Sequence, residues 1–306
     1  MNTIKVVSIN INGLKRKLTL LKQFILTNSI NILFIQEIHA LDLDILTSWS
    51  QRCNFLLYHN SQTNKQVNPS HFKQGTAILI NQNNTNYISI QCRNLVKNRV
   101  QILDITFPNT AFLFLNIYLP SGGSIKAIQS RYDLIQTIYS SLSENCTKDI
   151  FLLGDFNLVL SNSDRTGQFH PNSIDKILLN SLLLDFNLID IYRKFYPYKR
   201  LYSYVKPSGS SRLDRIYVSL SQETSIKDTD YITCSFSDHC QCPFVTFQIS
   251  SSVTSSIRKY HYWKLNDSIL ARKSTLQAIK SFILNYIANV PSSIPPILLW
   301  EKLKQN

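Results

Sequence analysis

The sequence is poor in glycine and has no long apolar run. Only seven of its 306 residues are glycine, and neither a GxGxxG nor a GxxxxGK[ST] pattern occurs. This excludes the common glycine-rich nucleotide-binding loops. No segment approaches the roughly 18 consecutive apolar residues that a membrane-spanning helix needs. The first residues lack a basic segment followed by an apolar core, so we expect no secretory signal and a nuclear or cytoplasmic protein.

The cysteines form no disulfide or zinc pattern that we recognise. The six are irregularly spaced, at Cys53, Cys92, Cys146, Cys234, Cys240 and Cys242. One residue separates Cys240 from Cys242, which is too few for a usual zinc knuckle, and no second Cys/His pair accompanies them. We therefore expect all six cysteines to be reduced and mostly buried.

Acidic side chains are also scarce, which leaves the chain strongly basic. Lys and Arg number 32 against 19 Asp and Glu, a formal net charge of +13. A basic balance favours an anionic partner, of which nucleic acid is the commonest. Apolar residues make up 44% of the sequence, and the chain is long enough to bury a sizeable core, so we expect an ordered globular protein.

Short apolar runs alternate with helical patterns through the first 249 residues. Strands are predicted at residues 5–9, 32–36, 76–80, 100–105, 111–118, 150–154, 215–218 and 243–247. Helical spacing of apolar residues predicts helices at 18–26 and 125–142. Many strands with a few interspersed helices predict an α/β protein in which two packed sheets are flanked by helices.

The composition changes near residue 250. Residues 250–256 are rich in serine and are typical of a polar linker. Beyond them, Asn266 or Asp267 can cap a helix with apolar residues on one face, which Pro291 ends. We therefore expect a main domain at residues 1–249, followed at 250–306 by a linker and a basic amphipathic helix.

Polar side chains gather at the ends of the predicted strands, where such folds place their sites. They include Asn10, Asn12, Glu37, His39, Tyr118, Asp155, Asn157, Ser211, Asp214, Asp238 and His239. Taken singly, each is more often a turn cap or a structural residue. Together, carboxylates and amides suit a hard cation such as Mg²⁺, and a histidine paired with a carboxylate suits proton transfer. The set predicts metal-assisted phosphodiester hydrolysis.

Seven motifs along residues 8–244 follow one another in a characteristic order. They are SININGL, IQEIH, NIYLPSG, LLGDFN, SDRTG, SRLDRIYVS and SDHCQCPF. This order resembles the endonuclease/exonuclease/phosphatase (DNase I-like) superfamily, and within it the endonuclease domain of LINE-type non-LTR retrotransposons. The resemblance implies a four-layered α/β/β/α sandwich of two packed mixed sheets. It also implies an endonuclease that uses Mg²⁺, with Mn²⁺ as the alternative ion, and that nicks one DNA strand to leave a 3′ hydroxyl for reverse transcription.

The resemblance assigns metal binding and water activation to five residues. Glu37 would be the main metal ligand, with Asn10 and Asp238 in support. Asp155, helped by Asn157, would position or deprotonate the attacking water.

Further roles follow from the same resemblance. His239, oriented by Asp214, would stabilise the transition state or transfer a proton, and Tyr118 would contact the scissile phosphate. DNA contacts, or support behind them, would come from Asn12, His39, Arg165, Ser203 and Ser211. Arg212 would contact DNA. Ser121 stands where family members often have asparagine, so phosphate contacts at this corner depart from the family pattern.

The expected partners are target DNA, element RNA and a reverse transcriptase domain that this chain does not contain, with the chain itself a monomer that binds no membrane. Residues 250–306 would be the remnant of the connection to that domain. The stretch between Arg193 and Arg215 interleaves basic and aromatic side chains and favours nucleic acid. The alternatives to a retrotransposon-type endonuclease are an apurinic repair endonuclease, a deadenylase, an inositol-polyphosphate phosphatase, or an inactive transposon-derived DNA-binding protein.

Overall fold

The computed structural model describes residues 3–14, 16–39, 43–61, 74–83, 85–145, 148–167, 172–207, 209–249 and 273–288. The chain divides into two compact units, Met1–Ser255 and Ser256–Asn306. No helix in the described ranges is long and apolar enough to cross a membrane. The five cysteines in these ranges are free, as expected.

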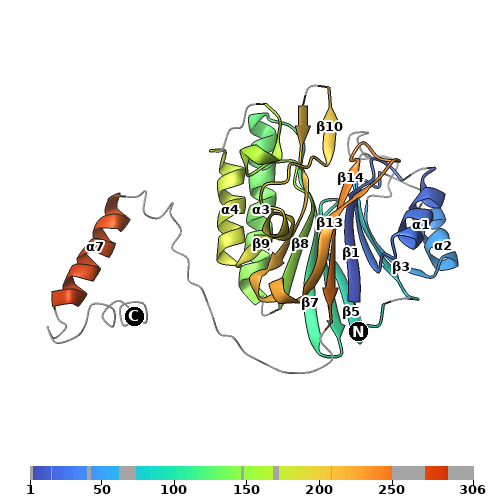
Figure 1. Cartoon of the computed structure of the whole chain (residues 1–306), viewed down its shortest axis with the longest axis horizontal. Helices are drawn as coiled ribbons and strands as arrows, with labels where there is room; N and C mark the ends of the chain where they lie inside the picture. The colour runs from blue at the N-terminus through green and yellow to red at the C-terminus, as the bar shows by residue number, and fades with distance from the viewer. Residues whose placement is uncertain are drawn as a thin grey trace. The chain divides into compact units, whose positions relative to one another are not determined.

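The first unit contains two six-stranded mixed sheets (Figure 1). One has the strand order β13-β14-β1-β2-β4-β3. Its strands are β1 Thr3–Asn10, β2 Ile32–Gln36, β3 Phe55–Asn60, β4 Thr76–Asn81, β13 Ile226–Thr233 and β14 Gln241–Gln248. Strands β1 and β2 run parallel and the other neighbours antiparallel. Because Asn10 pairs with Gln36, β1 and β2 end next to each other.

The second sheet has the order β5-β6-β7-β8-β12-β9. Its strands are β5 Ser89–Val96, β6 Val100–Phe107, β7 Thr110–Tyr118, β8 Asp149–Asp155, β9 Leu188–Asp190 and β12 Asp214–Ser219. Tyr118 and Asp214 both pair with Asp155, so the ends of β7 and β8 meet the start of β12. A separate hairpin joins β10 (Tyr204–Lys206) to β11 (Gly209–Ser211).

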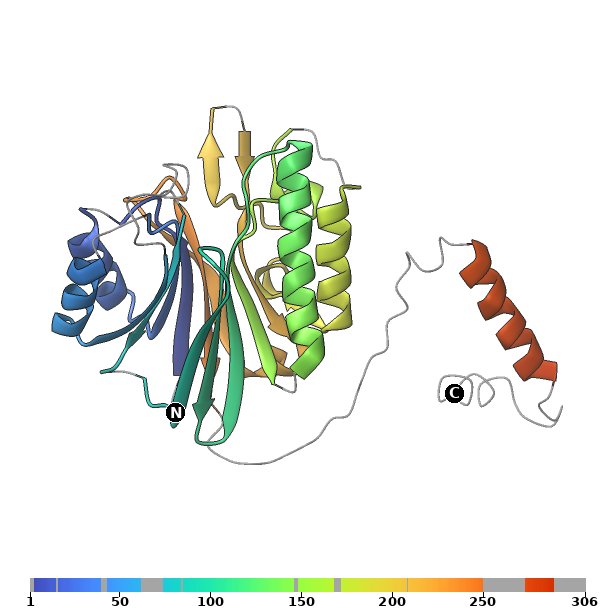
Figure 2. The same ribbon diagram turned by 180° about the vertical axis from the view of Figure 1, so that it is seen from behind.

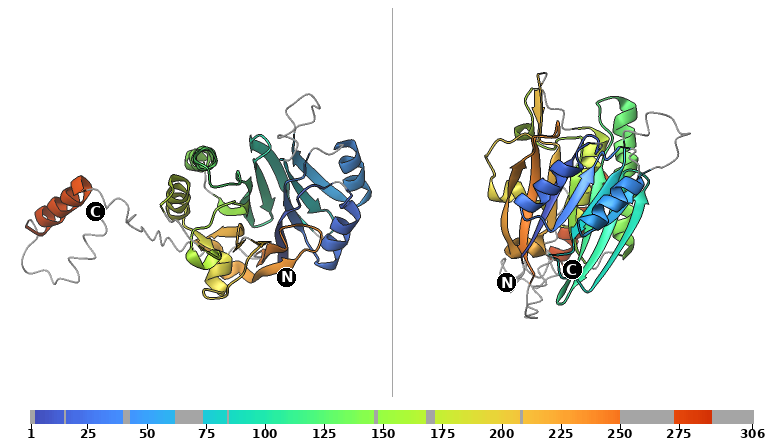
Figure 3. Two further views of the ribbon diagram at one scale, coloured as in Figure 1. Left: turned by 90° about the horizontal axis from the view of Figure 1, so that it is seen from above. Right: turned by 90° about the vertical axis from the view of Figure 1, so that its right-hand side faces the viewer.

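Helices cover the outer face of each sheet, as Figure 2 and the view from above in Figure 3 show. Helices α1 (Leu18–Thr27) and α2 (Leu43–Arg52) lie on the first sheet, and α3 (Ile125–Asn145) and α4 (Ile174–Asp185) lie on the second. Shorter helices are α5 Ile191–Phe195, η2 Asn162–Asp164 and η3 Leu220–Ser225. The expected four-layered α/β/β/α sandwich is confirmed.

Successive side chains of a strand point to opposite faces of its sheet, and the buried apolar residues form three separate clusters. In β2, Phe34 faces the core between the sheets, while Leu33 and Ile35 face the helices α1 and α2. A third cluster lies between the second sheet and α3 and α4. Aromatic rings fill the space between the sheets, with the rings of Phe114 and Phe151 4.8 Å apart. This explains why β2 reads as a continuous apolar run: both of its faces are buried.

The second unit contains α7, Lys273–Ala288. Its large apolar side chains include the exposed Leu276, Phe282 and Leu284. The predicted linker and the predicted capping residues Asn266 and Asp267 lie outside the described residues.

Candidate active site

The ends of five strands bring the predicted site residues to one end of the sandwich. Asn10 closes β1, Glu37 follows β2, Tyr118 closes β7, Asp155 closes β8 and Asp214 opens β12. The backbone of Glu37 adopts the left-handed conformation, with φ of 54°. Such a conformation is uncommon for a residue other than glycine and is often found at functional sites.

Asn10 links two carboxylates that come from different sheets. Its Nδ2 donates hydrogen bonds to Glu37 Oε1 at 3.0 Å and to Asp155 Oδ2 at 3.0 Å. The Tyr118 hydroxyl donates to the same Glu37 Oε1 at 2.7 Å. Burial, the largest influence, acts to raise the pKa of Glu37, but the neighbouring His39 and the two hydrogen bonds at Oε1 outweigh it and lower the pKa to about 2. Glu37 is therefore a carboxylate near neutral pH.

Asp155 lies in the floor of the site and is 1% exposed. Asn157 holds it through its backbone N–H, 3.0 Å from Oδ1, and through Nδ2, 2.8 Å from Oδ2. Burial and the negative charge of Asp214 raise the pKa of Asp155 above its usual range, against the charge of His239. A carboxylate with a raised pKa accepts a proton more readily near neutral pH, as a general base must.

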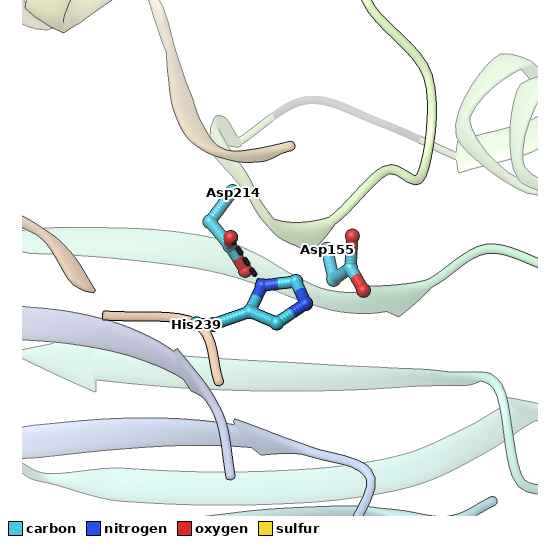
Figure 4. A group of neighbouring side chains, drawn as sticks. All are labelled: Asp155, Asp214 and His239. Carbon is cyan, nitrogen blue, oxygen red and sulfur yellow. Dashed lines mark hydrogen bonds and ion pairs between the residues drawn. The ribbon is translucent and has the colours of Figure 1, made fainter. Parts of the chain in front are cut away.

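His239 lies between two carboxylates (Figure 4). Its Nδ1 is 2.6 Å from Asp214 Oδ2, and the opposite edge of the imidazole faces Asp155. Burial lowers the pKa of His239, but the charges of the surrounding aspartates, Asp214 first, outweigh burial and raise the pKa to about 10. His239 is therefore an imidazolium at neutral pH. The ring of Tyr204 packs beside it, with the two ring centres 5.0 Å apart.

Ser203 supports this pair from behind. It is fully buried, and its Oγ accepts hydrogen bonds from the backbone N–H of Leu213 at 2.9 Å and of Asp214 at 3.1 Å. The Tyr231 hydroxyl donates to the backbone carbonyl of Asp214 at 2.7 Å. Ser203 thus supports Asp214 from inside the protein, and its side chain is not exposed for a contact with DNA.

Two groups of side chains have the chemistry to hold a cation. The ligand atoms of Asp155, Asp214 and His239 all lie within 4.8 Å of one another. However, an imidazolium has no free lone pair, and Nδ1 of His239 is already bound to Asp214. Glu37 fits better, because Oε1 accepts two hydrogen bonds while Oε2 faces only the imidazole of His39, at 3.5 Å, among the described residues. Mg²⁺ commonly binds through one or two carboxylates and keeps several waters.

The site opens into a cleft of about 710 Å³. Its lining residues include Glu37, Asn157, Arg165, Lys176, Lys206 and His239. Arg165 and Ser211 form a β-bridge at its wall, so these two predicted residues lie together. Asp238 is exposed at the rim, and Asn12 is exposed beside the site with its N–H bonded to Asn10 Oδ1. The lysines and arginines make the cleft suitable for a phosphate backbone.

The prediction that Arg212 contacts DNA is wrong. Its side chain is 1% exposed, and Nε and Nη2 donate to the two carboxylate oxygens of Asp164 at 2.8 and 2.9 Å. Asp190 binds the same guanidinium. A desolvated guanidinium that already has two carboxylate partners stabilises the fold and is not available to phosphate. Arg215 is also fully buried, so the basic stretch that begins at Arg193 is partly internal.

The outer part of that stretch is exposed. Lys199 pairs with Asp230, and Tyr198 is 94% exposed. Lys206 lies on the β10–β11 hairpin, with its ammonium 4.8 Å from the ring centre of Tyr204. The hairpin stands at the end of the sheets opposite the N-terminus, as Figures 1 and 2 show. The β-bridge between Tyr204 and His239 joins it to the site.

Sequence reasoning did not identify Arg99. Its guanidinium lies 4.4 Å from the ring centre of Tyr118, and Nη1 donates to the Tyr118 carbonyl at 3.4 Å. Burial, together with the carboxylate of Glu37, raises the pKa of the Tyr118 phenol. Tyr118 therefore remains a hydrogen-bond donor. Arg99 lies in a turn between two strands, where a basic residue in the sequence indicates only solvent exposure.

A buried polar network beneath the site was also not predicted. Gln36 Nε2 donates to Ser8 Oγ at 3.1 Å and to Asn116 Oδ1 at 2.7 Å. Asn116 Nδ2 donates to Gln101 Oε1 at 3.3 Å and to the Ala77 carbonyl at 3.1 Å. The network ties the two sheets together directly below Glu37. Polar residues inside otherwise apolar strands were the signal that could have revealed it.

Gly154 is required for the position of Asp155. It has φ of 140°, and a Cβ there would overlap the carbonyl of Ile117 in β7. We expect Gly154→Ala to lower the free energy of unfolding by roughly 3 kcal/mol or more. Gly123, whose added Cβ would meet nothing within 4 Å, is the matched control, and Gly123→Ala should change stability by less than about 1 kcal/mol. Equal urea midpoints for both variants would contradict this account.

Comparison with known proteins agrees with this geometry. The profile of the Endonuclease/Exonuclease/phosphatase family matches residues 7–239. The chain belongs to this family. It is therefore a metal-dependent enzyme of the phosphodiesterase and phosphatase class, as predicted.

Individual relatives are more distant. The transposon TX1 uncharacterized 149 kDa protein of Xenopus laevis is 22% identical over 285 residues, which is 90% of this chain and 20% of that protein. This chain thus spans about a fifth of that relative. The AP endonuclease LMAP of Leishmania major superposes with a TM-score of 0.69 at 15% identity, over 81% of this chain and 89% of that one. The 3′ phosphatase NExo from Neisseria, bound to product DNA hairpin, superposes with a TM-score of 0.63 at 18% identity, over 80% of this chain and 100% of that one.

Proposed function

We propose that the chain is a DNA endonuclease that uses Mg²⁺, or alternatively Mn²⁺, to nick one strand and leave a 3′ hydroxyl. The observation that carries the proposal is the pair of carboxylates bridged by Asn10, which lies next to the His239–Asp214 pair at the base of one basic cleft. Hydrolysis of a phosphodiester needs a base that activates water, a metal ion, and a donor that stabilises the negative charge developing on the phosphate. This arrangement supplies the base, the carboxylate for the metal and the charged donor.

Each residue then has a definite task. Asp155, held by Asn157, orients the attacking water and takes up its proton. His239 donates a charged hydrogen bond to the developing negative charge on the phosphate. The bond between phosphorus and the 3′ oxygen breaks, and the leaving 3′ oxygen takes a proton from solvent water. Glu37, with Asp238 nearby, would hold the metal, which supplies Lewis-acid stabilisation of the phosphate.

Three features support a DNA substrate and a product that ends in a 3′ hydroxyl. The chain carries a net charge of +13, and the cleft is lined by Arg165, Lys176 and Lys206. Ser211 lines the same cleft, and the Tyr118 hydroxyl donates to Glu37, which also lines it; both would contact phosphate or sugar there. A relative from a transposon supports a 3′ hydroxyl product, because such an end can prime a reverse transcriptase that copies element RNA. We propose that the nuclease acts as a monomer.

A plasmid assay tests the proposal. We expect the protein with Mg²⁺ to convert supercoiled plasmid to open circles, and EDTA to abolish the conversion. Glu37→Gln keeps the shape of the side chain but removes its charge, so it should reduce nicking by at least about 100-fold at limiting Mg²⁺. Extension of the nicks by a DNA polymerase without phosphatase treatment would identify 3′ hydroxyl ends.

The other outcomes separate the alternatives. DNA binding without cleavage in any divalent metal would favour the inactive DNA-binding protein. Cleavage confined to abasic sites would favour a repair endonuclease. Release of phosphate from inositol polyphosphates, or shortening of poly(A), in the absence of DNA nicking would overturn the proposal.

A further inference from the structure

The structure places the imidazole of His39 beside the carboxylate proposed to hold the metal. We propose that His39 Nε2 is a second protein ligand to that ion, so that the site binds Mn²⁺ and similar first-row transition cations more tightly than Mg²⁺. The inference rests on the proposed metal-dependent function and specifies which ion the site is built to hold.

The backbone positions Glu37 and His39 together. Both adopt the left-handed conformation, with φ of 54° and 57°. The loop after β1 fixes this segment, since Gly13 N donates to the Glu37 carbonyl at 2.7 Å and Leu14 N to the Ile38 carbonyl at 3.1 Å. Two uncommon backbone conformations, held by hydrogen bonds from a neighbouring loop, indicate that the directions of both side chains are specified.

The imidazole is seated against the same loop. A Cβ on Gly13 would lie 2.7 Å from His39 Nδ1, so a glycine at this position makes room for the ring. The other nitrogen, Nε2, lies 3.5 Å from Glu37 Oε2. That Nε2 is buried, and within the described part of the chain this long contact to Glu37 is the one polar partner that it has. A buried polar atom with so weak a partner is costly unless a ligand satisfies it.

Glu37 Oε2 and His39 Nε2 face each other and are suited to bind the same cation. Tyr118 and Asn10 occupy Glu37 Oε1, whereas Oε2 has only the long contact to His39 Nε2 among the described residues. Neighbouring ligands of an octahedral ion with bonds of about 2.1 Å lie roughly 3 Å apart, which a small side-chain movement from 3.5 Å would reach. A neutral imidazole is a good ligand for first-row transition ions, whereas Mg²⁺ prefers oxygen.

Pulsed EPR of the DNA-free full chain loaded with Mn²⁺ tests the proposal directly. We expect ¹⁴N modulation from a coordinated imidazole in the wild-type protein, changing in frequency when histidine is labelled with ¹⁵N. This measurement needs no variant. Absence of the modulation in the Mn²⁺-loaded wild type would overturn the proposal.

Variants then identify the histidine. His39→Gln should abolish the modulation and weaken Mn²⁺ binding by about 10- to 100-fold in calorimetry, with a smaller effect on Mg²⁺. His239→Gln is the matched control, because it removes the other imidazole of the site, and it should leave the modulation in place. Loss of the signal in His239→Gln alone would overturn the assignment. If the wild-type protein shows the modulation but nicks no DNA with any metal, the ligand assignment stands and the proposed function fails.

Discussion

Asp214→Asn should lower kcat for nicking by about 100- to 10,000-fold and restrict the remaining activity to low pH. The variant keeps the shape of the side chain but removes the main charge that raises the pKa of His239 to about 10. Burial, which lowers the pKa of this histidine, is then opposed only by the charges of Asp155 and Asp238, so the pKa falls. In the wild-type protein the imidazolium persists through neutral pH, whereas in the variant it loses its proton as the pH rises toward neutrality. Measurement of kcat between pH 5.5 and 9.5 would reveal the difference.

A matched variant separates this local effect from a change in net charge. Asp228 is exposed on β13 and has no role in the site, so Asp228→Asn should keep the wild-type pH profile. A profile of Asp214→Asn parallel to that of the wild type would show that His239 does not act as an imidazolium.

Asp164→Asn should lower the free energy of unfolding at pH 7 by about 3 kcal/mol. Asp164 is 2% exposed and is bound by Arg212 and Arg193. Without its charge, the buried Arg212 keeps Asp190 as its one acidic partner among the described residues. The backbone carbonyl of Asp164 also accepts a hydrogen bond from Arg212 N at 2.8 Å, two residues before Asp214, so we expect a loss of activity as well. Urea denaturation measures the change in stability.

We expect the stabilisation that Asp164 provides to depend on pH. Burial acts to raise the pKa of Asp164, but the surrounding arginines, Arg212 first, outweigh it and lower the pKa to about 2. A carboxyl whose pKa is depressed by folding stabilises the protein fully above its unfolded value of about 4, and the contribution is lost as the pH falls toward 2. The stability difference between wild type and Asp164→Asn should therefore shrink between pH 4 and pH 2.

The control for Asp164 is an aspartate in another ion pair whose side chains are more exposed. Asp104 pairs with Lys148, and the two side chains are 31% and 36% exposed. Asp104→Asn should change stability by less than about 1 kcal/mol. Similar losses for Asp104→Asn and Asp164→Asn would show that burial does not decide the strength of these pairs.

Local patterns in the sequence predicted the inner strands of both sheets and missed all four edge strands. No pattern indicated β3, β5, β9 or β13, which lie at the sheet edges. An inner strand such as β2 is buried on both faces and appears in the sequence as an apolar run. An edge strand such as β5 is half exposed and carries polar residues along its length. Its pairing depends on a neighbour that the local pattern does not reveal.

By itself, the sequence determined the family, the layered fold and the chemical type of the site, because ordered motifs and apolar periodicity are properties of the chain alone. The tertiary structure decided how the charges are used. Asn10 and Asp155 are 145 residues apart yet share a hydrogen bond, and Arg212 becomes a structural residue once Asp164 and Asp190 enclose it. The protonation and availability of a charged group depend on its burial and its neighbours, and distant segments supply both only when the chain has folded.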